Sequence, residues 1–196
     1  MCARSRQARA WLSAQLRDST AAAGAALASA SGLGAGPQKV YRALLSPPQS
    51  GSALLQLAVG ETLPLDTPIG RRPHGRLGSL WCAAAPGDGA ALPARSLLTL
   101  LEPRADGWLV QVAIATGRPH QIRIHGAAAG APLLGDPLYL PGGLARAEAL
   151  PGDGGYQLHA HRLSLNAPEG SRLVLEAPLP PLLQTALTSD HGCEQG

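Results

Sequence analysis

Residues 115–139 read ATGRPHQIRIHGAAAGAPLLGDPLY, and this stretch decides the expected fold. Between positions 120 and 125, two isoleucines alternate with polar side chains. Successive side chains of a strand point to opposite faces, so the alternation predicts a strand with one core face and one polar face. On the polar face, Arg123 could orient a carboxylate or a phosphate through its five N–H donors. The alternative interpretation is the edge of a sheet with solvated charges.

Short segments rich in Val, Leu and Ile lie on both sides of this stretch, bounded by Gly and Pro. Such segments predict strands, joined by turns at 103–107 and 116–119 and by a hairpin around 167–170. Helices are few, so the expected fold class is α+β with a mostly antiparallel mixed sheet. The strands are expected at 38–45, 52–60, 94–103, 107–115, 117–125, 155–166 and 171–178.

The first part of the chain predicts a helix followed by a linker. Ser5 is a good N-cap, and the apolar residues after it fall at helical spacing as far as Leu16. An Arg-rich transit peptide is the other interpretation of this start. Residues 19–36 carry no charge and no periodic large residue, so a low-complexity insert is expected there. Residues 64–78 are expected to form a basic loop with Arg71, Arg72, His74 and Arg76.

The composition fits one ordinary domain and excludes several classes of protein. The chain has 196 residues, of which 45% are hydrophobic and 15% charged, which argues against a wholly disordered chain. The sequence contains no uninterrupted run of about 18 or more apolar residues, so it predicts no membrane-spanning helix. Of the 16 basic residues, all but Lys39 are arginines. High-GC codon usage would explain this bias, and so would recognition of phosphate, which a guanidinium binds in a fork.

The three cysteines are far apart in the sequence and odd in number. They offer neither a disulfide framework nor a closely spaced pair of metal ligands, so we expect an intracellular, reducing compartment. His159 and His161 share a strand face and could chelate a metal. Structural metal sites use further local pairs of ligands, and none accompanies these two, so no metal site is expected.

Four segments, in order, resemble one family of RNA-modifying enzymes. TGRPHQIRIH followed by GAPLLGDPLY resembles the TGRTHQIRVH…GHPIVGDPLYG signature of the RsuA/RluA group of pseudouridine synthases, closest to the RluA type. Further segments of that family are similar to LSAQLR with KVYRALL, to DTPIGRRPHGRL, and to YQLHAHRLSLNAPEG with LVLEAPLP. The resemblance implies a catalytic domain over 1–183, interrupted by the insert 19–36, and a tail over 184–196.

The resemblance implies that the chain isomerises uridine to pseudouridine in structured RNA. In this family an Asp acts as nucleophile, the glycosidic bond breaks, and the base turns and is rejoined through carbon 5. No metal or organic cofactor is implied, and the expected partner is RNA, bound by a monomer that contacts no membrane. Tyr41 matches the family's active-site tyrosine, whose ring packs on the target base and whose hydroxyl could transfer a proton. Arg123 matches the arginine that pairs with the catalytic carboxylate and keeps it ionised.

The resemblance also implies that basic side chains contact the RNA. Arg118 and His120 would lie near the RNA backbone or at the rim of the site. The basic loop would contact phosphates through Arg71, Arg72 and Arg76, an attraction that weakens as the salt concentration rises. A solvated loop is the other interpretation of these three charges.

The family's catalytic motif, HRLD-x-x-TSG, does not occur in this sequence. The family places it just upstream of the strand that leads into the first helix, and only residues 2–4 represent that strand here. Asp136 matches the family's structural GDPLY turn and is no substitute. We therefore expect a domain incomplete at its amino end, with Arg123 left without a carboxylate partner. The chain would be a fragment or mis-started gene model of an enzyme, inactive alone, or a catalytically dead RNA-binding paralogue.

Overall fold

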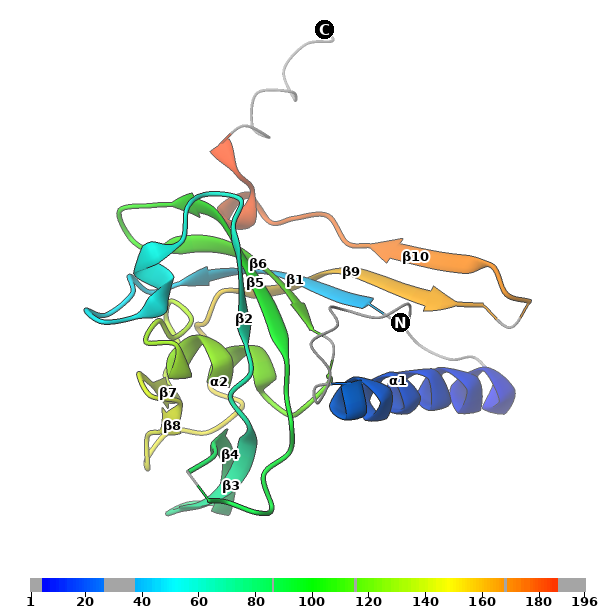
Figure 1. Ribbon diagram of the computed structural model, residues 1–196, viewed down its shortest axis with the longest axis horizontal. Coiled ribbons are helices and arrows are strands. Elements are labelled where there is room, and N and C mark those ends of the chain that lie inside the picture. The colour runs from blue at the N-terminus through cyan, green and yellow to red at the C-terminus, as the bar shows by residue number, and fades with distance from the viewer. Residues whose placement is uncertain (1–4, 27–37, 86, 115, 168, 187–196) are drawn as a thin grey trace, which may run out of the picture.

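A six-stranded antiparallel sheet forms the centre of the molecule (Figure 1). The computed structural model describes residues 5–26, 38–85, 87–114, 116–167 and 169–186. The strands of the sheet lie in the order β10-β9-β1-β6-β5-β2, and the pairs β3–β4 and β7–β8 form two separate small sheets. The expected α+β class with a mostly antiparallel sheet is confirmed.

Five of the expected strands are confirmed, and the segment at 38–45 matches its strand to the residue. The central strands are β1 (Gln38–Leu45), β2 (Thr62–Leu65), β5 (Ser96–Pro103), β6 (Trp108–Ile114), β9 (Leu158–Asn166) and β10 (Arg172–Glu176). The short strands are β3 (Ile69–His74), β4 (Gly78–Ala83), β7 (Tyr139–Leu140) and β8 (Leu144–Ala145). The helices are α1 (Arg6–Ala26), α2 (Gln121–Ala128) and the 3-10 helices η1 (Ala53–Gln56) and η2 (Pro181–Leu183).

Helix α2 packs on one face of the central sheet and closes the main core. Burial alternates along β5 and β6, as expected for strands with one core face. Ile122 of α2 belongs to the same buried cluster as Leu45, Val110 and Val112 of the sheet. The 3-10 helix η2 covers part of the opposite face through Leu183.

The largest correction concerns the strand expected at 117–125, which does not form, because residues 121–125 belong to helix α2. All residues from Gln121 to Ala127 are buried, so polar and apolar side chains alike face protein. Six alternating residues were therefore too few to distinguish the two-residue period of a strand from the 3.6-residue period of a helix. The helix packs closely on the chain that follows because Gly126 lacks a side chain: a Cβ there would lie 2.9 Å from the carbonyl oxygen of Ala131.

Two other expectations about local structure are wrong. Residues 52–60 form no strand, because the Ser52 hydroxyl accepts a hydrogen bond from the Leu54 amide at 3.1 Å and starts the 3-10 helix η1. Residues 64–78 are no loop, because β3 occupies their middle and pairs along its whole length with β4. The Gly and Pro residues that suggested a loop are accommodated in a short two-stranded sheet, where each strand forms ladder hydrogen bonds on one side only.

Helix α1 begins as the sequence predicted and ends later. Ser5 caps it by accepting a hydrogen bond from the Ala8 amide at 3.1 Å. The helix continues to Ala26, so the first part of the expected insert 19–36 is helical, as its alanine content favours. The rest of that insert lies outside the described residues. No helix in the described part of the chain is long and apolar enough to cross a membrane.

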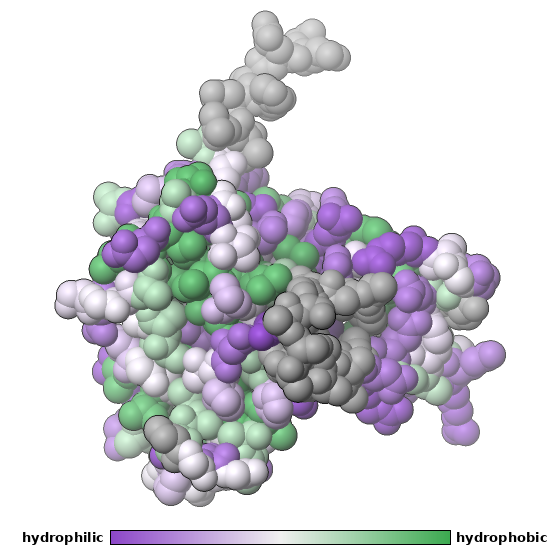
Figure 2. Space-filling model, viewed as in Figure 1, coloured by the Kyte–Doolittle hydropathy of each residue, from purple (hydrophilic) through white to green (hydrophobic). Residues whose placement is uncertain are grey.

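Helix α1 lies beside the β9–β10 hairpin, and hydrophilic side chains cover its outer side (Figures 1 and 2). Two hydrogen-bonded contacts fix it. The Gln15 side-chain amide exchanges two hydrogen bonds with the backbone of Asn166 at the end of β9. The Thr20 hydroxyl accepts a hydrogen bond from the Gly117 amide at 3.2 Å, in the turn before α2.

A buried histidine joins α2 to strand β5. Nε2 of His125 lies 3.0 Å from the Thr67 carbonyl oxygen, and Nδ1 lies 2.9 Å from the Ser96 hydroxyl. Because a carbonyl only accepts, Nε2 carries the proton and Nδ1 accepts from Ser96. Burial lowers the pKa of His125 to about 4, although the Thr67 hydrogen bond and the charge of Asp66 oppose that shift. The imidazole is therefore neutral in the folded protein near pH 7.

This histidine should make the folded state sensitive to acid. An unfolded histidine binds a proton below about pH 6.5, whereas folded His125 does not do so until about pH 4. Stability is therefore fully present above about pH 6.5 and is lost as the pH falls towards 4, by up to about 3 kcal/mol. Urea unfolding at several pH values will measure this loss. The His125→Gln variant should show a flatter pH dependence between 7 and 4, and an unchanged slope would refute the assignment.

Candidate functional site

One cleft collects four of the residues that the sequence singled out. It has a volume of about 230 Å³ and lies between β1, the start of α2 and the segment that approaches β9. Tyr41, Arg118, His120 and Arg123 all line it. The other lining residues are Ile114, Gln121, Ile122, Pro151, Tyr156 and Leu158. Residues from distant parts of the sequence thus converge on one concave surface, which makes it the candidate site.

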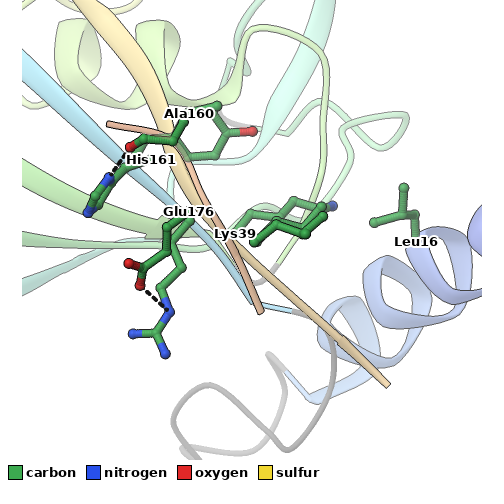
Figure 3. A pocket seen from close by; sticks show the side chains of 10 residues that line it. Leu16, Lys39, Ala160, His161 and Glu176 are labelled. Carbon is green, nitrogen blue, oxygen red and sulfur yellow. Dashed lines mark hydrogen bonds and ion pairs between the residues drawn. The ribbon is translucent and has the colours of Figure 1, made fainter. Parts of the chain in front are cut away.

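Tyr41 enters the cleft from β1, where the register with β9 shifts between Val40 and Tyr41. The extra residue is His161 of β9, whereas β1 pairs with β6 without interruption. Burial raises the pKa of Tyr41, so its hydroxyl keeps its proton at neutral pH. The same residue lines a second cleft of about 380 Å³, which also contains Lys39 and His161 and which α1 borders through Leu16 (Figure 3).

Arg123 is almost completely buried, with 4% of its side chain exposed. Its Nε and Nη2 donate to the two carboxylate oxygens of Asp136 at 2.8 and 2.7 Å, and Nη1 donates to the Pro151 carbonyl at 3.2 Å. The rings of Tyr156 and Tyr139 lie near the guanidinium, with centroids 4.1 and 5.1 Å from its carbon. Three of the five N–H groups are engaged in this way, so two remain for another partner.

The side chain of Asp136 is fully buried. Its Oδ1 also accepts hydrogen bonds from the backbone amides of Leu138 and Tyr139 at 2.8 and 3.2 Å. Burial acts to raise the pKa of Asp136, but hydrogen bonds from Arg123 and the two amides outweigh it and lower that pKa. The expectation that Arg123 lacks a carboxylate partner is therefore wrong, because the GDPLY turn supplies one.

His120 and Arg118 lie at the start of α2. His120 has a left-handed backbone (φ 53°, ψ 20°), and its Nδ1 lies 2.7 Å from the Tyr139 hydroxyl. That hydroxyl donates to the Trp81 carbonyl, also at 2.7 Å. Arg118 donates through Nε to the Pro93 carbonyl at 3.0 Å. Both residues are half-buried and line the cleft, in addition to standing at its edge.

The other expected RNA contacts lie outside the cleft, on the β3–β4 hairpin. The guanidinium of Arg71 lies 5.2 Å from the ring centroid of Trp81, and Nη1 of Arg76 donates to the Glu148 carbonyl at 3.1 Å. The Nε of Arg72 is buried, with no hydrogen-bond partner among the described residues. None of these three arginines lines the cleft. The sequence therefore grouped residues that the structure divides between a cleft and a separate basic hairpin.

Three residues near the site were not identified from the sequence. Lys39 lies two positions before Tyr41 on β1, so the two share a strand face, and burial lowers the pKa of Lys39. Its position two residues before Tyr41 could have identified Lys39 in the sequence. Tyr139 and Tyr156 reach Arg123 only through the turns that follow α2. No local pattern in the sequence announces such contacts.

The two histidines of β9 are not part of the cleft. The ring centroids of His159 and His161 are 6.4 Å apart, and Nδ1 of His161 lies 2.9 Å from the Ala177 carbonyl. Among the residues that the structure describes, no three His, Cys, Asp or Glu side chains gather as a metal-binding group.

Comparison with known proteins finds relatives of one kind. The chain is 38% identical over 151 residues to an uncharacterized RNA pseudouridine synthase of Synechocystis, covering 76% of this chain and 47% of that protein. It is 34% identical over 213 aligned residues to RNA pseudouridine synthase 5 of Arabidopsis thaliana, covering 94% of this chain and 54% of that protein. The chain thus spans about half the length of these two relatives. No protein-family model matches it.

Two further comparisons agree. Ribosomal large subunit pseudouridine synthase D of Neisseria meningitidis is 38% identical over 122 residues, covering 59% of this chain and 31% of that protein. The fold is similar to the solved structure of human RNA Pseudouridylate Synthase Domain Containing 1, with a TM-score of 0.57 and 22% identity over 92% of this chain and 64% of that one. The structural match supports the fold.

The Arg123–Asp136 pair should be essential for stability. Replacing Asp136 by Asn leaves the buried guanidinium without its countercharge, which should cost about 3 to 5 kcal/mol in the free energy of unfolding. The matched control is Asp66→Asn. Asp66 also forms a two-pronged pair with Arg95, but its side chain is 43% exposed, so the cost there should stay under about 1 kcal/mol. Urea unfolding of both variants measures the difference, and equal costs would contradict the assignment.

Proposed function

Because the chain belongs to the RluA-type pseudouridine synthase family, we propose that its cleft receives a uridine of a structured RNA and takes part in isomerising it to pseudouridine. The observation that carries the proposal is the meeting of Tyr41 and Arg123 in one cleft. These are the two residues that match the family's active-site tyrosine and motif arginine. The target base must leave its stack to reach such a cleft, which costs a few kcal/mol if the base was paired.

Each of the two residues has a defined task in this proposal. The ring of Tyr41 packs on the target base, and its protonated hydroxyl is available for proton transfer at carbon 5. Arg123 is held in place by Asp136 and turns its two remaining N–H groups to a second carboxylate, the nucleophile. An arginine anchored at one edge loses little freedom when it binds at the other, which favours an ionised and well-aimed nucleophile.

The nucleophile is the missing part of this site. Among the described residues, no carboxylate lines the cleft, and Asp136 lies behind Arg123 with its oxygens engaged. We therefore propose that residues 1–196 alone do not catalyse the isomerisation, since without the nucleophilic Asp nothing can attack the ribose. A catalytically dead RNA-binding paralogue is the second candidate, and the same lack of a cleft carboxylate favours it.

The first experiment measures turnover. Isomerisation replaces the C5–H bond of uridine by a bond to the ribose, so RNA labelled with tritium at uridine C5 releases the label when it reacts. Purified residues 1–196 should release none above background. If the gene encodes an in-frame R-L-D-x-x-T-S-G segment upstream of Met1, the chain that includes it should release tritium, and its Arg123→Lys variant should release much less. Release by residues 1–196 alone would overturn the proposed inactivity, and a stop codon upstream would favour the paralogue.

The second experiment tests the basic hairpin. We propose that Arg71 and Arg76 contact RNA phosphates, because both are exposed on β3–β4 and have no acidic partner among the described residues. The double variant Arg71→Gln, Arg76→Gln should bind structured RNA more weakly. The slope of log affinity against log salt should become shallower by about 0.7 to 0.9 for each phosphate that is no longer neutralised. Arg172→Gln, an exposed change on β10, is the matched control. An unchanged slope in the double variant would refute the assignment.

A further inference from the structure

The hydrogen bonds around His120 fix the position of its proton. The hydroxyl of Tyr139 has one hydrogen, and the Trp81 carbonyl, which can only accept, receives it at 2.7 Å. Nδ1 of His120 lies 2.7 Å from the same hydroxyl oxygen, so Nδ1 must donate to it. A neutral imidazole with its proton on Nδ1 carries a lone pair on Nε2. The structure thus sets one tautomer of His120 from within the protein.

The lone pair on Nε2 of His120 is left for a ligand of the cleft. His120 lines the cleft, and no described residue forms a hydrogen bond with its Nε2. The hydrogen bond between Nδ1 and the Tyr139 hydroxyl, at 2.7 Å, holds the ring in this orientation. Burial lowers the pKa of His120, and the nearby charge of Arg123 adds to that shift while Asp136 opposes it. A neutral imidazole is therefore the form that the cleft presents.

Three other polar side chains of the cleft cannot accept a hydrogen bond from a ligand. Arg118 and Arg123 only donate. The amide of Gln121 is fully occupied: its oxygen accepts from the Thr116 hydroxyl and the Arg118 amide, and its nitrogen donates to the Arg95 carbonyl and the Ser96 hydroxyl. Besides the hydroxyls of Tyr41 and Tyr156, which both donate and accept, the side-chain acceptor left in the described cleft is Nε2 of His120.

This arrangement complements one base in particular. Along its pairing edge, uracil presents an acceptor, a donor and an acceptor, namely O4, N3–H and O2. Cytosine presents an amino donor and then two acceptors, so its N3 would meet the imidazole with lone pair against lone pair. We propose that His120 is the residue by which this cleft distinguishes uracil from cytosine, accepting the N3–H while Arg118 supplies a donor for a carbonyl oxygen. This inference rests on the proposed function and deepens it.

His120 thereby takes a different role from the backbone contact that the sequence predicted. A residue that contacts an RNA phosphate must donate to it, because phosphate oxygens repel a lone pair. A site built to hydrogen-bond a substrate N–H rejects the analogue that lacks it, because the site's own polar group is then left unpaired. His120 therefore acts as a specificity residue, and Tyr139 acts through it as a positioning residue.

The tautomer can be measured without RNA. Long-range ¹H–¹⁵N spectra of labelled residues 1–196 at pH 7 report which ring nitrogen carries the proton. The His120→Asn variant identifies the signals among the six histidines, and asparagine tolerates the left-handed backbone. Nδ1 should be protonated and Nε2 should not. An imidazolium, or a proton on Nε2, would overturn the proposal even if the chain binds RNA as proposed.

The discrimination is tested by binding. Three structured RNAs of one sequence carry uridine, cytidine or N3-methyluridine at a single unpaired position, and fluorescence anisotropy gives their affinities. The wild-type chain should bind the uridine RNA about tenfold more tightly than the other two, and His120→Asn should abolish this preference. Arg71→Gln is the matched control, since it should weaken all three RNAs equally.

The outcomes separate the proposed function from the role of His120. If the wild-type chain binds none of the RNAs, the proposed function fails and this inference fails with it. If the wild-type chain prefers uridine and His120→Asn keeps that preference, the assignment of His120 fails alone. An equal loss of affinity for all three RNAs in His120→Asn would show a backbone contact and overturn the inference. Binding without any preference in the wild-type chain would also overturn it.

Discussion

The buried ion pair between Arg123 and Asp136 is the interaction on which the cleft depends. A charge inside a protein is tolerated only when a countercharge and hydrogen bonds surround it. Arg123 sits on α2, and its shell comes from the turn before β7, from Pro151 and from the ring of Tyr156. The long segment after α2 must therefore fold back over the helix to enclose the arginine. In doing so it forms the outer wall of the cleft.

The cleft combines two fixed cations with one neutral imidazole. Its cations are fixed by partners behind them: Asp136 holds Arg123, and the Pro93 carbonyl holds Arg118. Burial and the nearby charge of Arg123 lower the pKa of its imidazole, and a hydroxyl that is itself hydrogen-bonded to a carbonyl fixes the tautomer. Groups held in this way need little rearrangement when a ligand arrives, which is the property that makes a polar cleft effective. The basic hairpin is different, because Arg71 and Arg76 reach into solvent and suit the less specific attraction of phosphates.

The sequence predicted the sheet well and the site in part. Short apolar segments bounded by Gly or Pro, such as 38–45, indicated the strands. The segment 120–125 misled because nearly all of it is buried, so polarity no longer followed exposure. Resemblance to a family brought Tyr41 and Arg123 together before any geometry was known. It could not reveal the partner of Arg123, since that contact depends on how the turn at Asp136 closes on α2.

Helix α1 carries a consequence for the order of folding. Its anchors join residues separated by 151 and 97 positions in the chain, at the far end of β9 and in the turn before α2. Neither anchor exists until most of the sheet has formed, and closing such long loops early would cost entropy without any contact in return. Helix α1 precedes its partners in the chain and is nevertheless among the last elements to dock. During synthesis, α1 stays undocked until the strands that it contacts have been translated.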